Sequence, residues 1–216
     1  MAAAVAPPEL PELELRALDD LRESRELELE GVLVETASSE PIHPVQVRIT
    51  ESELRGVTLG AGGVPGLRLN DVILRGCDLS NVDGREGALL RVEISRSRLL
   101  GFALTGGSLQ DVRVTDSSLA LCSFAFSKLR DVSFEQLDLT EASFMDAQLE
   151  RVEFVGCKLA GADFRNAKLK GCSIRGASLD GVLGVERLRG VTMPWVDLLD
   201  SVAALATAVG IVVESE

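Results

Sequence analysis

The sequence predicts an all-β solenoid, a four-sided coil of parallel strands closed at its C-terminal end by a helix. Three observations predict this fold. Between residues 47 and 181, large apolar residues recur at every fifth position, small or apolar uncharged residues stand two places before each of them, and all charged residues fall elsewhere. Helices repeat about every 3.6 residues and strands every two, so neither accounts for a period of five.

The large inward position begins at Ile49 and returns every five residues as far as Leu179. Of these 27 positions, 26 are apolar and Gly84 is the exception. A unit of five residues with two inward side chains is too short for a helix, but it forms one side of a coil. Four such sides close a coil of 20 residues, and successive coils pair as in a parallel sheet, about 4.8 Å apart. Residues 20 apart should therefore stack in columns.

The repeat unit resembles that of the pentapeptide-repeat family, which reads roughly Ala-Asp-Leu-x-x. The best matches are 77–81, 142–146, 162–166 and 177–181. The resemblance implies a right-handed quadrilateral parallel β-helix of pentapeptide repeats. We expect this β-helix over residues 27–189, after a Pro/Glu-rich N-terminal segment and cap (1–26) and before a C-terminal helix and short strand (190–216).

Both ends of an open β-helix need covering, because unpaired strand edges invite aggregation. Leucines of the N-terminal segment could fold over the first edge: Leu13, Leu15, Leu18 and Leu21. At the other end, Pro194 and Gly210 bracket a short predicted helix, and Ile211–Val213 is predicted as a strand. One apolar stripe of the helix should cover the last coil: Val196, Leu199, Val202, Ala203, Ala206 and Val209.

The sequence offers little for catalysis. All four cysteines occupy the small inward position, so we expect buried, reduced thiols, which suit the cytoplasm. They are Cys77, Cys122, Cys157 and Cys172. His43 is the one histidine and has no evident acid or nucleophile partner, and no CxxC motif suggests a metal site. We therefore expect no enzyme, no metal and no cofactor.

The net charge of −12 lies in the tails, because residues 41–189 hold 19 acidic and 19 basic residues. An acidic chain is a poor ligand for nucleic acid, and no membrane partner is expected. Within the neutral rod a local acidic belt is the candidate partner-binding site. Its members are Asp131, Glu135, Asp138, Glu141, Asp146, Glu150 and Glu153.

Two functions from different classes fit these observations. The first is a cytoplasmic protein-interaction or scaffold module of unknown partner. It is suggested by apolar residues expected to point outward, namely Leu100, Leu121, Phe126 and Met145. The alternative is implied by the family resemblance: a DNA-mimicking protector or inhibitor of DNA gyrase, a type II topoisomerase, that confers quinolone or toxin resistance. A rod without net charge imitates DNA poorly, whereas the acidic belt favours the imitation.

The predicted C-terminal helix is apolar on nearly every side, and such a helix is normally buried on more than one side. The rod end supplies one side, so we expect a second copy to supply another through a two-fold contact. The family resemblance also implies a homodimer joined at the C-terminal ends. The predicted interface residues are Trp195, Leu198, Leu199, Val202 and Leu205.

Overall fold

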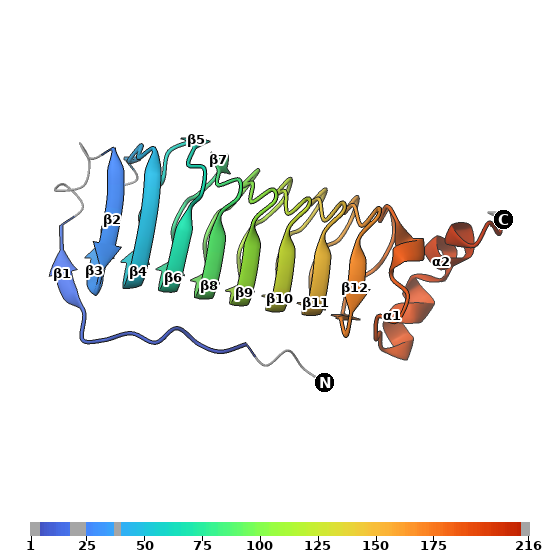
Figure 1. Cartoon of the computed structure of the whole chain (residues 1–216). Helices are drawn as coiled ribbons and strands as arrows, with labels where there is room; N and C mark the ends of the chain where they lie inside the picture. Colours follow the sequence, from blue (N-terminus) through green and yellow to red (C-terminus); the bar gives the residue numbers. More distant parts are fainter. Residues whose placement is uncertain (1–4, 18–24, 37–39, 213–216) are drawn as a thin grey trace.

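The computed structural model describes residues 5–17, 25–36 and 40–212. It shows a parallel β-solenoid of about eight turns that ends in short helices, which confirms the predicted fold class (Figure 1). The strands are β1 (Glu14–Arg16), β2 (Glu26–Glu30), β3 (Val32–Glu35), β4 (Gln46–Arg55), β5 (Gly62–Gly63), β6 (Arg68–Arg75), β7 (Val82–Asp83), β8 (Ala88–Ser95), β9 (Ser108–Thr115), β10 (Lys128–Glu135), β11 (Gln148–Val155), β12 (Lys168–Lys170) and β13 (Ser173–Arg175). The helices are the 3₁₀ helix η2 (Val185–Arg187), α1 (Trp195–Asp200) and α2 (Val202–Ala208).

Neighbouring coils pair in parallel with a constant offset of 20 residues. Leu69 of β6 lies opposite Leu89 of β8, and Leu89 lies opposite Leu109 of β9. The chain turns a corner every five residues: from Glu51 to Gly181, every fifth residue except Ala61 has a positive φ. The corner follows the large inward residue by two places, so the period of five is the length of one side.

The interior is a set of stacked columns, as the pattern predicts. The large inward residues from Ile49 onward are buried, except for Leu169 near the C-terminal end, which is partly buried, and the hydrophobic core contains no charged residue. Phenylalanines fill the C-terminal half. The rings of Phe144 and Phe164 stack with centroids 4.9 Å apart, and Phe154 meets Phe144 edge-on at 5.6 Å. The glycine-rich stretch near residue 62 stays within the coil, because its strand β5 pairs with β7.

The N-terminal segment both covers an edge and runs back along the rod. Strand β1 pairs with β3, so backbone pairing covers the outer edge of β3. Residues 5–13 then lie lengthwise beside later coils (Figure 1). The predicted leucine cap is wrong at Leu15, which is 75% exposed, while Leu13 is half-buried. Leu18 and Leu21 lie outside the described residues.

The C-terminal end differs from the prediction in two ways. The helix does begin after Pro194, its N-cap, but it breaks at Ser201 into α1 and α2. The predicted capping stripe is wrong, because most of its members are exposed and α2 instead packs Ala204, Leu205 and Ala208 on the core. The strand predicted at Ile211–Val213 is also wrong for its described residues, since Ile211 and Val212 form no strand.

Two polar side chains explain this orientation, Asp197 of α1 and Ser201 at its C-cap. The open last coil has backbone N–H groups with no further coil to accept them. The Asp197 carboxylate accepts a hydrogen bond from the N–H of Gly176 at 2.6 Å, and the Ser201 hydroxyl accepts one from the N–H of Leu179 at 3.2 Å. These two acceptors turn one side of α1 toward the rod and leave its apolar residues outside. None of the described helices is long and apolar enough to span a membrane.

Candidate interaction surfaces

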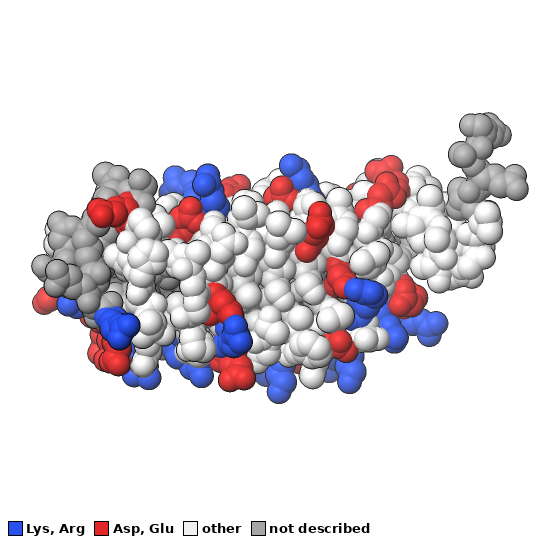
Figure 2. Space-filling model, turned by 90° about the horizontal axis from the view of Figure 1, so that it is seen from above, with Lys and Arg blue, Asp and Glu red and all other residues white. Residues whose placement is uncertain are grey.

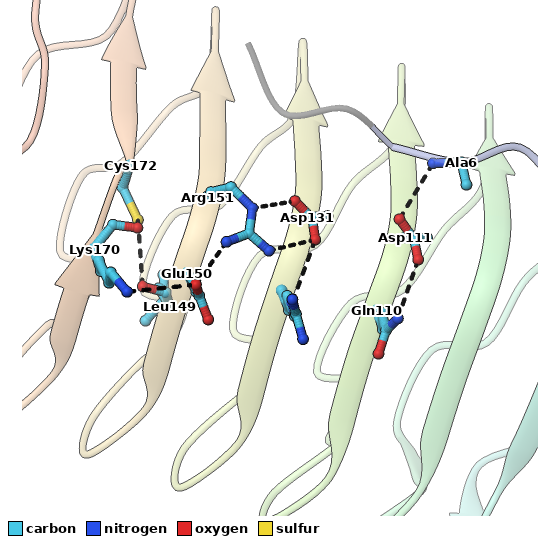
Figure 3. A network of polar contacts seen from close by, with 10 residues as sticks. Ala6, Gln110, Asp111, Asp131, Leu149, Glu150, Arg151, Lys170 and Cys172 are labelled. Atoms are coloured by element: carbon cyan, nitrogen blue, oxygen red, sulfur yellow. Dashed lines mark hydrogen bonds and ion pairs between the residues drawn. The ribbon is translucent and has the colours of Figure 1, made fainter. Parts of the chain in front are cut away.

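The seven residues of the acidic belt do not share one face. Along the chain, the belt runs almost one full coil from Asp131 to Glu150, so the residues between them lie around the perimeter of the solenoid. Arg151 gathers two of its carboxylates: Nε and Nη2 donate to Asp131 at 2.5 and 2.7 Å, and Nη1 donates to Glu150 at 2.6 Å (Figure 3). The guanidinium holds the pKa of Asp131 below its ordinary value. Lys170 adds a second cation 3.8 Å from Glu150.

Most other belt carboxylates are also compensated. Glu135 lies 3.5 Å from Arg113, and Glu153 is buried, where it accepts a hydrogen bond from the hydroxyl of Ser173. The backbone N–H of Thr140 donates to Asp138 at 3.1 Å, and hydrogen bonds from Thr140 lower the pKa of this carboxyl. Among the described residues, ion pairs engage only Asp131, Glu135 and Glu150 of the belt. Asp138 and Glu153 accept hydrogen bonds instead, and the carboxylates of Glu141 and Asp146 have neither kind of contact with a described residue.

A corner column holds a second arginine–aspartate pair. Arg91 donates two hydrogen bonds to Asp71, at 2.6 and 2.5 Å, and thereby lowers the pKa of that buried carboxyl. The backbone N–H of Glu9 donates to the same carboxylate at 3.0 Å, and that of Ala6 donates to Asp111 two coils farther along (Figure 3). This column thus binds the N-terminal segment. Acid and base 20 residues apart are the sequence signal that could have predicted these pairs.

The C-terminal end carries most of the exposed large apolar surface. Thirteen large hydrophobic residues are exposed in the described chain, and seven of them lie between Trp195 and Val212. Of the predicted dimer residues, Trp195, Leu199 and Val202 are more than half exposed. Leu198 and Leu205 are half-buried, and Leu205 packs against the core.

One side of the solenoid is free of charge over its middle coils. Figure 2 looks onto the side that carries β5 and β7, and its middle shows neither acidic nor basic residues. Leu100, Leu121 and Phe126 are exposed, as expected, and Met145 is half-buried. We call the following set the uncharged face: Ala103, Thr105, Leu121, Ser123, Ala125, Phe126, Ser143 and Met145.

A different side bears a shallow groove of about 910 Å³. Stacked polar residues line it, with acids and bases alternating so that Arg98 lies 3.8 Å from Asp78. The groove floor includes Cys77, whose thiol is buried and donates to the carbonyl of Leu54. Burial raises the pKa of Cys77 to about 11, so this thiol is not a nucleophile at neutral pH.

The other predicted site residues hold no reactive arrangement. The remaining three cysteines are buried like Cys77, and burial raises the pKa of each thiol. His43 is exposed, with its imidazole ring lying over Gly60. Among the residues that the structure describes, no group of three or more His, Cys, Asp or Glu side chains could hold a metal ion.

Residues 108–183 match the family model for the pentapeptide repeat region. This segment of the chain therefore carries pentapeptide repeats, and the same offset of 20 residues continues on its N-terminal side. No curated protein matches the sequence.

Several solved structures resemble this one. A trypsin-treated form of QnrB1, a plasmid-mediated fluoroquinolone resistance protein, is 21% identical, with a TM-score of 0.45 over 89% of this chain and 99% of that one. HetL, a pentapeptide repeat protein involved in heterocyst differentiation regulation in the cyanobacterium Nostoc sp. strain PCC 7120, is 18% identical, with a TM-score of 0.28 over 80% and 91%. Rfr23 of the cyanobacterium Cyanothece 51142 is 16% identical, with a TM-score of 0.16 over 66% and 88%.

Proposed function

We propose that this protein is a non-catalytic cytoplasmic rod that binds other proteins, and that two copies join through their C-terminal ends. The observation that carries the proposal is the concentration of exposed apolar side chains on α1, α2 and the residues that follow. Contiguous exposed apolar surface of this kind marks a protein interface.

A second copy is the occupant that best suits this end. The inner side of α1 is already occupied, because Asp197 and Ser201 bind the last coil. Val196 and Leu199 are three residues apart and therefore share a side of α1, and both are more than half exposed. The surface lies at the tip of an elongated molecule (Figure 1), so a two-fold contact there can form without the two rods colliding.

Light scattering on the intact protein and on a Leu199→Glu, Val202→Glu double variant tests the dimer. We expect twice the chain mass for the intact protein and monomer mass for the variant. Both residues are more than half exposed, so their substitution spares the core, whereas a change at Leu205 would disturb it. Leu15→Glu is the matched control, since it places the same charge on an exposed leucine at the other end. Monomer mass for the intact protein across a tenfold concentration range would refute the dimer.

Salt provides an independent check. Residues 190–216 hold four acidic and no basic residues, so two copies bring like charges together. Added salt screens that repulsion, and we expect the dimer to tighten between low and moderate ionic strength. Weakening by salt would point to ion pairs and contradict an apolar seam.

The DNA-mimicking alternative gains little support from the belt, because its carboxylates lie around the perimeter and three of them, Asp131, Glu135 and Glu150, are paired with arginine or lysine. It has a direct assay of its own. Inhibition of gyrase supercoiling by micromolar protein, lost when Asp131, Asp138 and Asp146 are changed to Lys, would favour it over the proposed rod.

A further inference from the structure

Two corners of one coil carry residues that are unusual there. The positive-φ corners are occupied by glycine or by polar and charged residues, and Leu121 and Phe126 are the apolar exceptions in the described chain. Both have a φ of 60°. A left-handed backbone is uncommon for any residue with a Cβ, and bulky apolar residues lack the local hydrogen bonds that let Asn and Asp tolerate it.

These residues gain nothing from burial in return. Leu121 is 56% and Phe126 58% exposed. Backbone strain combined with exposed apolar surface, at two successive corners, is a cost to the folded chain. Such a cost is typical of positions selected for contact with a partner.

The floor between the two corners is suited to being covered. Its outward residues are small, and Ala125 is already buried. The hydroxyls of Thr105 and Ser123 lie 3.1 Å apart and hydrogen-bond to each other. The backbone N–H groups of Leu121 and Phe126 donate to the next coil at 2.9 Å. Excluding water from this floor therefore leaves few polar groups without a partner.

Acidic residues mark one rim of the uncharged face. Glu141 follows Leu121 in its corner column, and Asp146 follows Phe126 in the next. Within the described chain, these are the two belt residues whose carboxylates have neither an ion pair nor a hydrogen bond. Farther along, Arg165 is engaged by Asp163 through three hydrogen bonds between their side chains. Glu141 and Asp146 thus place uncompensated negative charge at this rim.

We propose that the uncharged face binds a basic amphipathic helix of another protein. Its apolar stripe would lie between Leu121 and Phe126, with Lys or Arg residues reaching Glu141 and Asp146. Strand addition is disfavoured here because the backbone of this side already pairs with both neighbouring coils. This inference rests on the proposed function, since it names the surface of the rod that takes a partner and the chemistry of that partner.

The test titrates a fluorescent 16-residue peptide with the full chain and follows the fluorescence anisotropy of the peptide. The peptide consists of Leu and Lys, spaced so that it forms an amphipathic helix. We expect micromolar binding, weakened at least tenfold by Leu121→Asn with Phe126→Asn. The same double variant should melt at the same or a higher temperature, because Asn suits a left-handed corner. Leu15→Asn is the matched control and should leave peptide binding unchanged. Equal binding by the double variant, or a marked fall in its melting temperature, would overturn the inference.

Charge supplies the second arm. The double variant Glu141→Gln, Asp146→Asn should bind the Lys peptide several-fold more weakly, and its binding should depend less on salt. A Leu/Glu peptide of the same pattern should not bind. The inference would also be overturned if the Lys peptide failed to bind, or if the protein bound anionic lipid vesicles in preference to the peptide. Light scattering on the same variants keeps the two proposals separate, because a normal dimer without peptide binding removes this inference alone.

Discussion

At the scale of single residues, inward and outward positions alternate sharply along one short segment. Phe144 is fully buried between Phe124 and Phe164, while Ser143 beside it faces outward. Phe144→Asp should lower the free energy of unfolding by about 4 kcal/mol or more, since it buries a charge with no partner. Ser143→Asp should change it by less than about 1 kcal/mol. Urea unfolding of both variants measures the difference, and equal losses would contradict the assigned register.

The Asp71–Arg91 pair makes a prediction about pH at the same scale. Its arginine lowers the pKa of Asp71 in the folded state, so the pair stabilises the fold above the carboxyl's unfolded pKa of about 3.9 and ceases to do so as pH falls through the lower folded value. Asp71→Asn, which suits the same corner, should cost about 1–3 kcal/mol at pH 7. The deficit should shrink below about pH 4. Urea unfolding of both proteins from pH 7 to 2 measures this difference in stability. A difference that does not change with pH would rule out the charge of Asp71 as its source.

At the scale of elements, α1 closes the rod with two side-chain acceptors. Ser201→Ala should destabilise the protein by about 1–3 kcal/mol, because it leaves the buried N–H of Leu179 without an acceptor. Asp197→Ala should cost less, since its bond to Gly176 is exposed. Thr207→Ala is the control, because that hydroxyl contacts α2 alone. Thermal melting compares the three. A Ser201 variant as stable as the control would show that α1 closes the rod by other means.

The elements also show what sequence reasoning can reach. Burial repeats every five residues, so one phase assigns every inward side chain from Ile49 to Leu179, and the offset of 20 follows from four sides. The ends lie outside that repetition. The packing of Leu205 and the path of residues 5–13 depend on single contacts, such as Ser201 with Leu179 and Glu9 with Asp71. Acid–base pairs such as Asp71 with Arg91 follow from the same offset of 20, once charges are compared between neighbouring coils instead of counted along the chain.

At the scale of the whole molecule, a neutral rod ends in acidic tails, and its exposed apolar residues lie at the tip and on one side. Removing residues 1–12 tests whether the N-terminal segment belongs to the rod's stability. It contributes two backbone hydrogen bonds to aspartates of the corner column, so we expect a loss of no more than about 1–3 kcal/mol and an unchanged fold. Urea unfolding followed by circular dichroism measures this loss of unfolding free energy. Loss of the folded signal in the truncated chain would show instead that the segment is required for folding.

The ladder of phenylalanine rings has a consequence for how the molecule opens. Five rings, from Phe124 to Phe164, interlock with centroid distances between 4.9 and 6.2 Å. The coils before them are filled mainly by aliphatic residues, and Phe102 is the one phenylalanine of their described core. In a stack where each coil touches only its neighbours, local opening free energies add along the axis. Amide protons of β10 and β11 should therefore exchange with deuterium last, and those of β4 and β6 earlier. The solenoid would fray from its N-terminal end toward a persistent aromatic half, next to the tip at which two copies are proposed to meet.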